Sequence, residues 1–234
     1  STGGATGTLD LSDAELGLVT TTGVLQIGDT GAGAITVDAS ITPANVATVH
    51  LQTGAGITDT AGSIITETNL AITAGGTVTL DVGHDVGTVA ADLSSGTGSF
   101  TFDDTNTLTV GTVDAVVGLT TNGGNINLNT ADGLTQSDNI TTTSGTNAGT
   151  VTLDADSDAD GTGTYTIGAG VTLDTDDVTT DGTISVSAGD VSIDTSGTPA
   201  TLQAGSAAVS VTTSQNANTI GINDAAEGLN ITGA

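Results

Sequence analysis

One acidic segment, DADSDADG, places four aspartates at alternate positions and ends with a glycine; its aspartates are Asp154, Asp156, Asp158 and Asp160. The last three, followed by Gly161, match the opening of a calcium-binding loop, where hard oxygen ligands alternate and a glycine permits a sharp turn. The twelfth position of an EF-hand loop is a bidentate Glu, but this chain has Ile167 there. An EF-hand is therefore excluded, and two interpretations stay open: a looser calcium site at a corner of the fold, or a solvated acidic turn.

Further aspartates extend this acidic pattern along the chain. The predicted metal ligands are Asp154, Asp156, Asp158, Asp160, Asp174 and Asp176, with calcium as the predicted ion. Asp154, Asp174 and Asp194 are equally spaced, so coils of that length would stack them about 5 Å apart, where like charges cost of order 1 kcal/mol in water. Because the chain has no Lys or Arg, these carboxylates must bind cations, take up protons or face the solvent. We expect millimolar binding of a divalent cation within residues 154–181.

The residues for catalysis are missing from the sequence. The two histidines, His50 and His84, do not stand at a metal-ligand spacing, and we expect both on the surface. The chain has no G-x-S-x-G motif, no nucleophile with a plausible base and no basic group to stabilise an anionic transition state. We therefore predict that the protein is not an enzyme and has no catalytic or cofactor-binding residues.

The elements that must position the aspartates are short strands. Runs of alternating Val, Ile and Thr bounded by Gly, Asn or Asp recur along the 234 residues, for example at 34–39, 99–104 and 149–156. The mean hydropathy of +0.18 argues against disorder, and aromatic residues make up 1% of the chain, so the core must be thin and aliphatic. No amphipathic helix is predicted, although Leu9–Leu16 has the composition for one helical turn.

Repeats predict how these strands are arranged. The phrase small-Gly-x-[Val/Ile]-x-[Leu/Ile]-[Asp/Asn] ends at Leu80-Asp81, Leu128-Asn129, Leu153-Asp154 and Ile193-Asp194, with a shorter version at Leu173-Asp174. Several of these leucines and isoleucines recur at one constant interval. Such a unit, with strands but no helix, is typical of a parallel β-solenoid of roughly 20 residues per coil, here roughly twelve coils about 55 Å long. The alternative, an immunoglobulin-type sandwich, usually buries a Trp, which this chain lacks.

The wording of the repeats resembles the filamentous-haemagglutinin-like exoproteins that Gram-negative bacteria secrete by the two-partner route. The similar phrases are VLQIGDTGAGAITVDASI (Val24–Ile41), the segment Val49–Leu93 and the segment Gly98–Gly133. The resemblance implies a right-handed parallel β-helix that is exported to the cell surface or the extracellular space and works as the shaft of a fibre or adhesin. The absence of basic residues departs from a typical member, and no segment matches the family's secretion domain.

We therefore interpret residues 1–234 as a single solenoid domain, either a segment of a longer shaft or a subunit that stacks into filaments. Neither end of the sequence predicts a helix or a polar cap, so end-to-end self-association or continuation of the same chain is expected. The net charge of −27 argues against nucleic acid as a partner, and no apolar run is long enough to insert into a membrane.

Two alternative functions stay open. One is an adhesin that recognises a surface or a glycan, although Phe100, Phe102 and Tyr165 are the only aromatic residues available for stacking on sugars. The other is ice binding through Thr-x-Thr pairs such as Thr77/Thr79 and Thr150/Thr152, which do not recur at a constant interval.

Overall fold

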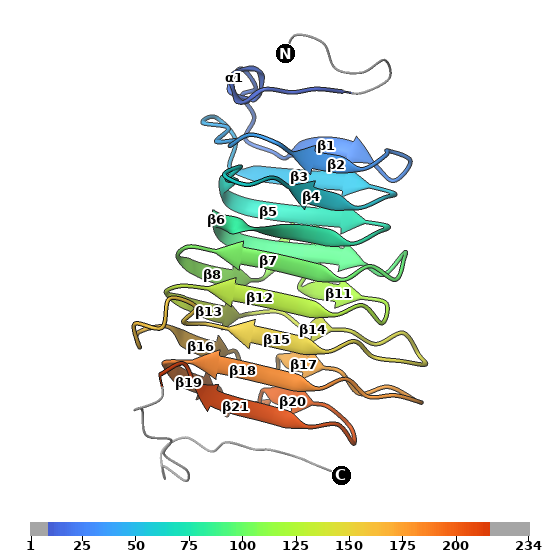
Figure 1. Ribbon diagram of the computed structural model, residues 1–234, viewed down its shortest axis with the longest axis vertical. Coiled ribbons are helices and arrows are strands. Elements are labelled where there is room, and N and C mark those ends of the chain that lie inside the picture. The colour runs from blue at the N-terminus through green and yellow to red at the C-terminus, as the bar shows by residue number, and fades with distance from the viewer. Residues whose placement is uncertain (1–8, 216–234) are drawn as a thin grey trace.

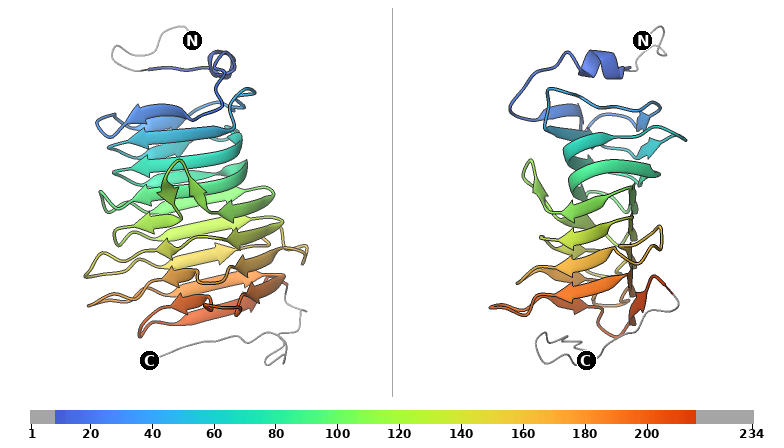
Figure 2. Two further views of the ribbon diagram at one scale, coloured as in Figure 1. Left: turned by 180° about the vertical axis from the view of Figure 1, so that it is seen from behind. Right: turned by 90° about the vertical axis from the view of Figure 1, so that its left-hand side faces the viewer.

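The computed structural model describes residues 9–215 and shows an all-β, right-handed parallel β-solenoid (Figure 1). The chain winds around one axis, and its strands lie on three faces (Figure 2). The predicted fold is thereby confirmed. Eight strands stack on the first face, so the described residues form about eight coils, fewer than the roughly twelve expected from the spacing of the repeats.

The first face is an uninterrupted parallel ladder. Its strands are β2 (Ile35–Val37), β4 (Ile57–Asp59), the beginning of β6 (Val78–Leu93), β7 (Phe100–Asp104), β12 (Ile126–Thr130), β15 (Val151–Asp154), β18 (Ile184–Ala188) and β21 (Val209–Thr213).

The other two faces carry the remaining strands of each coil. The second face contains β8 (Thr107–Val110), β13 (Gly133–Gln136), β16 (Thr164–Ile167) and β19 (Asp190–Ile193). The third face contains β1 (Leu25–Asp29), β3 (Thr48–Thr53), β5 (Thr66–Ala74), the end of β6, β11 (Leu119–Thr121), β14 (Ile140–Thr141), β17 (Thr172–Asp174) and β20 (Thr201–Gln203). Strand β6 runs through all three faces, since it pairs successively with β7, β8 and β11.

The core is a single aliphatic column inside the coils. Alternation along each strand turns every second side chain inward, and the pairing register places like residues over one another. On the first face, for example, Ile57, Val78, Phe100 and Ile126 follow each other in register and are at most 1% exposed. Small and medium side chains therefore suffice to fill the interior, because each coil needs to reach only the coil beside it.

The length of a coil is not constant, whereas the repeats predicted roughly 20 residues per coil with insertions in some turns. Val78 pairs with Phe100 and Val151 pairs with Ile184, so the later coil is half as long again as the earlier one. The constant spacing of the repeats instead connects different faces: Leu153 lies on β15, Leu173 on β17 and Ile193 on β19. A Gly-x-Val-x-Leu phrase fits the strand of any face, so the phrase alone does not identify equivalent positions.

A glycine column lines the corner between the third and first faces; its members are Gly56, Gly76, Gly98, Gly124, Gly149 and Gly182. A Cβ atom on Gly124 would lie 1.9 Å from the carbonyl oxygen of Gly98, and one on Gly182 would lie 1.9 Å from that of Gly149. Backbones of neighbouring coils therefore touch at this corner, and no side chain fits between them.

Buried threonines close the same corner in coils of different length. Thr121 Oγ1 donates to Gly124 O at 2.6 Å, whereas Thr175 Oγ1 donates to Gly182 O, seven residues on, also at 2.6 Å. Extra residues bulge outward between the threonine and the glycine. This explains how coil length varies while the ladder stays in register.

The N-terminal end of the described solenoid is covered by a short segment. Helix α1 (Asp13–Leu16) is a single turn with a capping box between Ser12 and Glu15, and its Leu16 joins the core at 4% exposure. Asp13 Oδ1 accepts a hydrogen bond from Thr42 N at 2.6 Å, which ties the turn to the first coil. The predicted helical turn is confirmed, but the expectation of an uncapped N-terminal end is wrong. Within residues 9–215, no helix has the length and hydropathy of a membrane span.

A hairpin leaves the solenoid between β8 and β11. Its strands β9 (Thr112–Val113) and β10 (Val116–Val117) pair antiparallel around Asp114 and Ala115, which both have positive φ. The hairpin lies against the outside of the third face (Figure 2), where Val113 packs with Ala71 and Ala90. The sequence pattern did not separate it from the preceding strand.

Candidate metal centre

The aspartate segment forms an outward loop, residues 156–161, at the corner between the first and second faces. Strand β15 ends just before it, and β16 begins just after it. Ser157 N donates to Thr130 O of the neighbouring coil at 2.9 Å, and Ala159 N donates to Asp156 O at 2.9 Å. Ala159 and Gly161 have φ angles of 56° and 88°. The loop is therefore a tight turn inserted into one of the long coils.

Three predicted ligands meet in this loop: carboxylate oxygens of Asp156, Asp158 and Asp160 lie within 4.8 Å of one another. Oxygens on opposite sides of a calcium ion are about 4.6–5.2 Å apart, because each lies about 2.3–2.6 Å from the ion. All three carboxylates can therefore contact one calcium ion without a change of backbone. Asp158 and Asp160 are exposed, so water can supply further ligands.

Asp156 differs from the other two because it is 1% exposed. Its Oδ2 accepts a hydrogen bond from Gly161 N at 2.9 Å, and also from Ser214 Oγ. Its Oδ1 is buried and has no hydrogen-bond partner. Leaving a buried carboxylate oxygen unpartnered costs about 1–3 kcal/mol or more. A cation that pairs with Asp156 would therefore stabilise the folded protein more than one that pairs with an exposed carboxylate.

Electrostatics distinguish the two exposed aspartates. Hydrogen bonds from the Thr162 side chain and backbone lower the pKa of Asp160. Partial desolvation, together with the charges of Asp160 and Asp156, raises the pKa of Asp158. The loop thus concentrates negative charge in a way that favours a positive ion.

Asp154 lies beside this loop, at the end of β15. It pairs with Asn129 on one side and with Ser187 on the other, and its Oδ1 accepts a hydrogen bond from Asp156 N at 3.2 Å. Asp154 also lines an open groove beside the loop; the other lining residues are Gly83, Asp103, Asp104, Thr105, Asn129, Ala131, Ser157 and Asp158. Burial raises the pKa of both Asp103 and Asp104. These two carboxyl groups were missed in the sequence because only the register places them in one groove with Asp154, on the far side of Asn129.

Asp174 and Asp176 lie elsewhere, at the corner between the third and first faces. Asp174 Oδ1 accepts from Asp176 N at 3.0 Å, and Asp176 Oδ2 accepts from Gln203 Nε2 at 2.8 Å. The neighbouring Asp181 accepts from Ser206 Oγ and N, and hydrogen bonds of this kind lower its pKa to about 2. Carboxylates at this corner already have donors within the protein.

The predicted stack of like charges is therefore wrong. Asp174 pairs with Thr141 and Gln203, not with Asp154, and Asp194 follows β19 on the second face. Variable coil lengths separate the three aspartates and place neutral polar residues next to them. The six predicted ligands therefore lie at two different corners of the solenoid. Among these six residues, only Asp156, at the corner between the first and second faces, has a buried oxygen without a hydrogen-bond partner.

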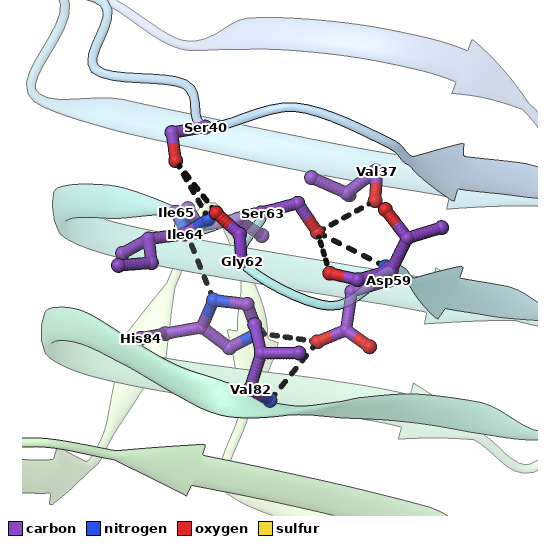
Figure 3. A network of polar contacts seen from close by, with 10 residues as sticks. Val37, Ser40, Asp59, Gly62, Ser63, Ile64, Ile65, Val82 and His84 are labelled. Atoms are coloured by element: carbon purple, nitrogen blue, oxygen red, sulfur yellow. Dashed lines mark hydrogen bonds and ion pairs between the residues drawn. The ribbon is translucent and has the colours of Figure 1, made fainter.

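Both histidines are buried, which corrects their expected surface position. His84 is fully buried, and its Nδ1 accepts from Ile65 N at 3.0 Å, so its Nε2 donates to Asp59 Oδ2 at 3.1 Å (Figure 3). Burial lowers the pKa of His84, which favours the neutral imidazole. Ser63 also lies in this network, but it contacts the carbonyl oxygens of Thr60 and Val37 (Figure 3). This group joins coils and is closed to substrates.

His50 attaches the hairpin to the solenoid. Its Nδ1 lies 2.7 Å from Asp114 Oδ2 at the hairpin tip, and its Nε2 lies 3.0 Å from Thr73 Oγ1. Asp114 is 64 residues further along the chain, so no local sequence signal identifies this pair. Both nitrogens are engaged within the protein, as expected for a packing residue.

Glu67 is a second buried carboxyl group with an unpartnered oxygen, Oε1. Burial raises its pKa above the ordinary value of 4.5. The unfolded chain therefore ionises first as the pH rises, and the folded state loses stability between pH 4.5 and the pKa of the folded state. At neutral pH, Glu67 destabilises the fold.

We predict that Glu67→Gln raises the melting temperature at pH 8 but not at pH 4. A gain of about 1 kcal/mol corresponds to about 2–4 °C for a domain of this size. The control is Glu15→Gln: hydrogen bonds from Ser12 lower the pKa of Glu15, so its removal should not stabilise the protein at pH 8. Calorimetry at both pH values measures the difference, and an unchanged melting temperature at pH 8 would contradict the prediction.

Comparison with known proteins gives no relative: no family model, no curated protein and no solved structure matches this chain.

Proposed function

We propose that this protein is a structural component of an extracellular fibre, in which the β-solenoid is a rigid shaft. The observation that carries the proposal is the unbroken ladder of eight strands on the first face. At the usual strand spacing, this ladder extends about 34 Å along the axis. Every coil is bonded to its neighbours through the backbone, so the rod resists bending along its whole length.

The charge of the chain fits such a role. The chain has 27 acidic residues and no Lys or Arg to neutralise them. Neighbouring rods therefore repel each other at low salt, and divalent cations bridge them. Proteases that cleave after Lys or Arg find no site in the sequence. Location at the surface of a Gram-negative bacterium follows from the resemblance of the repeats to secreted exoproteins.

We propose that the shaft grows by further coils of the same chain or by end-to-end self-association. The segment around Leu16 lies over the first described coil and covers the end of the core there. A contact through that end therefore requires residues 9–16 to move aside or to form part of the interface. Edges that are left uncovered pair readily with other strands.

Electron microscopy of the pure protein, with and without calcium, tests the proposal. We expect straight rods whose length grows with concentration or in a longer version of the chain. Short particles that never lengthen, together with binding on a glycan array, would favour the adhesin. All three aromatic side chains, Phe100, Phe102 and Tyr165, are at most 1% exposed, which leaves none for a sugar platform.

Ice binding is the second candidate function, and the register of the first face favours it. A polar column faces outward along all eight strands: Thr36, Thr58, Thr79, Thr101, Asn127, Thr152, Ser185 and Ser210. Thr79 and Thr152 are thus in one column although their sequence spacing is irregular. A regular column of polar side chains, most of them hydroxyl groups, can match the regular spacing of water molecules at an ice surface. An ice-recrystallisation assay decides this: inhibition that is lost in Thr101→Tyr supports ice binding, and no inhibition removes it.

A further inference from the structure

Loop 156–161 contacts the chain two coils further on. Asp156 Oδ2 accepts a hydrogen bond from Ser214 Oγ, and Gln215 Nε2 donates to Ala159 O at 2.6 Å. Strand β18 lies between β15, which precedes the loop, and β21, which ends just before Ser214. The loop therefore bridges two coils that have no strand pairing with each other.

Asp156 takes part in both the bridge and the acidic cluster. Its Oδ2 accepts hydrogen bonds from Gly161 and Ser214, and its buried Oδ1 has no hydrogen-bond partner. One carboxylate oxygen of Asp156 lies within 4.8 Å of carboxylate oxygens of Asp158 and Asp160. A buried carboxylate requires a positive or hydrogen-bonding partner at each oxygen. Since the chain has no Lys or Arg, no such side chain can supply a positive charge at this oxygen, and a bound cation can.

We propose that Asp156, Asp158 and Asp160 bind one calcium ion, and that the ion holds loop 156–161 in the conformation that fastens residues 214 and 215. The ion pairs with the buried carboxylate of Asp156 and relieves the repulsion between the three carboxylates. Without the ion, the loop opens, and both Ser214 and Gln215 lose their acceptors. Three carboxylates completed by backbone oxygens and water give the millimolar affinity of extracellular calcium modules.

Hydrogen–deuterium exchange of the full chain measures whether calcium fastens residues 214 and 215 through loop 156–161. We call this contact the calcium latch. On addition of millimolar calcium chloride, we expect exchange of the backbone amides in 209–215 to slow at least threefold. Amides of β3 in the second coil should not change. Calorimetry should show saturable heat in the same concentration range. Absence of that heat, or heat without slower exchange in 209–215, would overturn the proposal.

Two variants separate the ion from the bridge. Asp158→Asn/Asp160→Asn removes two exposed ligands, so both the heat and the calcium-dependent protection should disappear. Ser214→Ala keeps the ligands, so the heat should remain while the protection of 209–215 by calcium falls. The matched control, Asp29→Asn/Asp38→Asn, removes two exposed charges from the first coil, far from the loop, and should behave like the wild type. If the control lost as much of the calcium-binding heat, calcium would be associating diffusely with the acidic surface and not at one site. That result would overturn the proposal.

This inference is independent of the fibre proposal. A protein without the latch still has an eight-strand ladder, so rods in the microscope and a calcium-insensitive 209–215 would contradict only the latch. Calcium-dependent protection in a protein that forms no rods would contradict only the shaft.

Discussion

Replacing Gly124 with alanine is expected to destabilise the protein by about 3 kcal/mol or more, at the upper end of overpacking costs. The new Cβ would lie 1.9 Å from Gly98 O and 2.6 Å from Gly98 C. Both atoms belong to the backbone of the neighbouring coil, so no side chain can rotate away. Relief requires the two coils to separate, which weakens the ladder on both sides of the corner.

The control for this substitution is Gly33→Ala, because a Cβ on Gly33 meets nothing within 4 Å. Neither glycine has a positive φ, so the comparison isolates the steric contact from backbone strain. Urea denaturation of both variants gives the free energies of unfolding. Equal stabilities would show that neighbouring coils are further apart than the glycine column requires.

Replacing His84 with alanine is expected to cost about 3–5 kcal/mol, because it leaves a cavity in the core and two buried polar groups without their hydrogen-bond partners. The substitution removes the donor to Asp59 Oδ2 and the acceptor for Ile65 N. Asp59 has a side-chain exposure of only 3%, so water cannot replace the lost donor. The ring also packs against Phe102 at a centroid distance of 5.2 Å, and this contact is lost too.

The pH dependence of the His84 variant provides a second measurement. Because burial lowers the pKa of His84, the unfolded chain takes up the proton first as the pH falls. Wild-type stability should therefore fall below about pH 6.5, and His84→Ala should lack this component. His50→Ala is the comparison, since it releases the hairpin tip and leaves the core network intact. A His84→Ala variant with the stability and pH profile of the wild type would contradict the assigned network.

The local pattern of the sequence predicted the strands and the central cluster of the candidate site. Alternation of Val, Ile and Thr is sufficient to recognise a strand, because every second side chain must be apolar whichever face the strand joins. The D-x-D-x-D-G segment also predicted one cluster correctly, since its three carboxylates are brought together by a single tight turn. The one-turn helix at Asp13–Leu16 was recognised from its acidic start in the same local way.

The pairing of the coils was not predictable from the same pattern. Asp154 and Asp174 belong to one evenly spaced series in the sequence but lie at different corners, because β15 and β17 belong to different faces. Loops between faces differ in length, and only the closed coil shows which strand lies above which. The buried positions of His50 and His84 follow from partners 64 and 25 residues away, which no short window contains.

Composition and strand pattern are thus enough to predict a thin aliphatic core, an all-β class and 27 acidic side chains with no Lys or Arg to neutralise them. Which carboxylates accept hydrogen bonds, and which buried oxygen has no partner, depends on how the coils are folded against one another. The physical reason is that side-chain alternation is a property of one strand, whereas register, burial and charge pairing depend on contacts between coils. Asp156 shows this most clearly, since its partner Ser214 comes from two coils further along the chain.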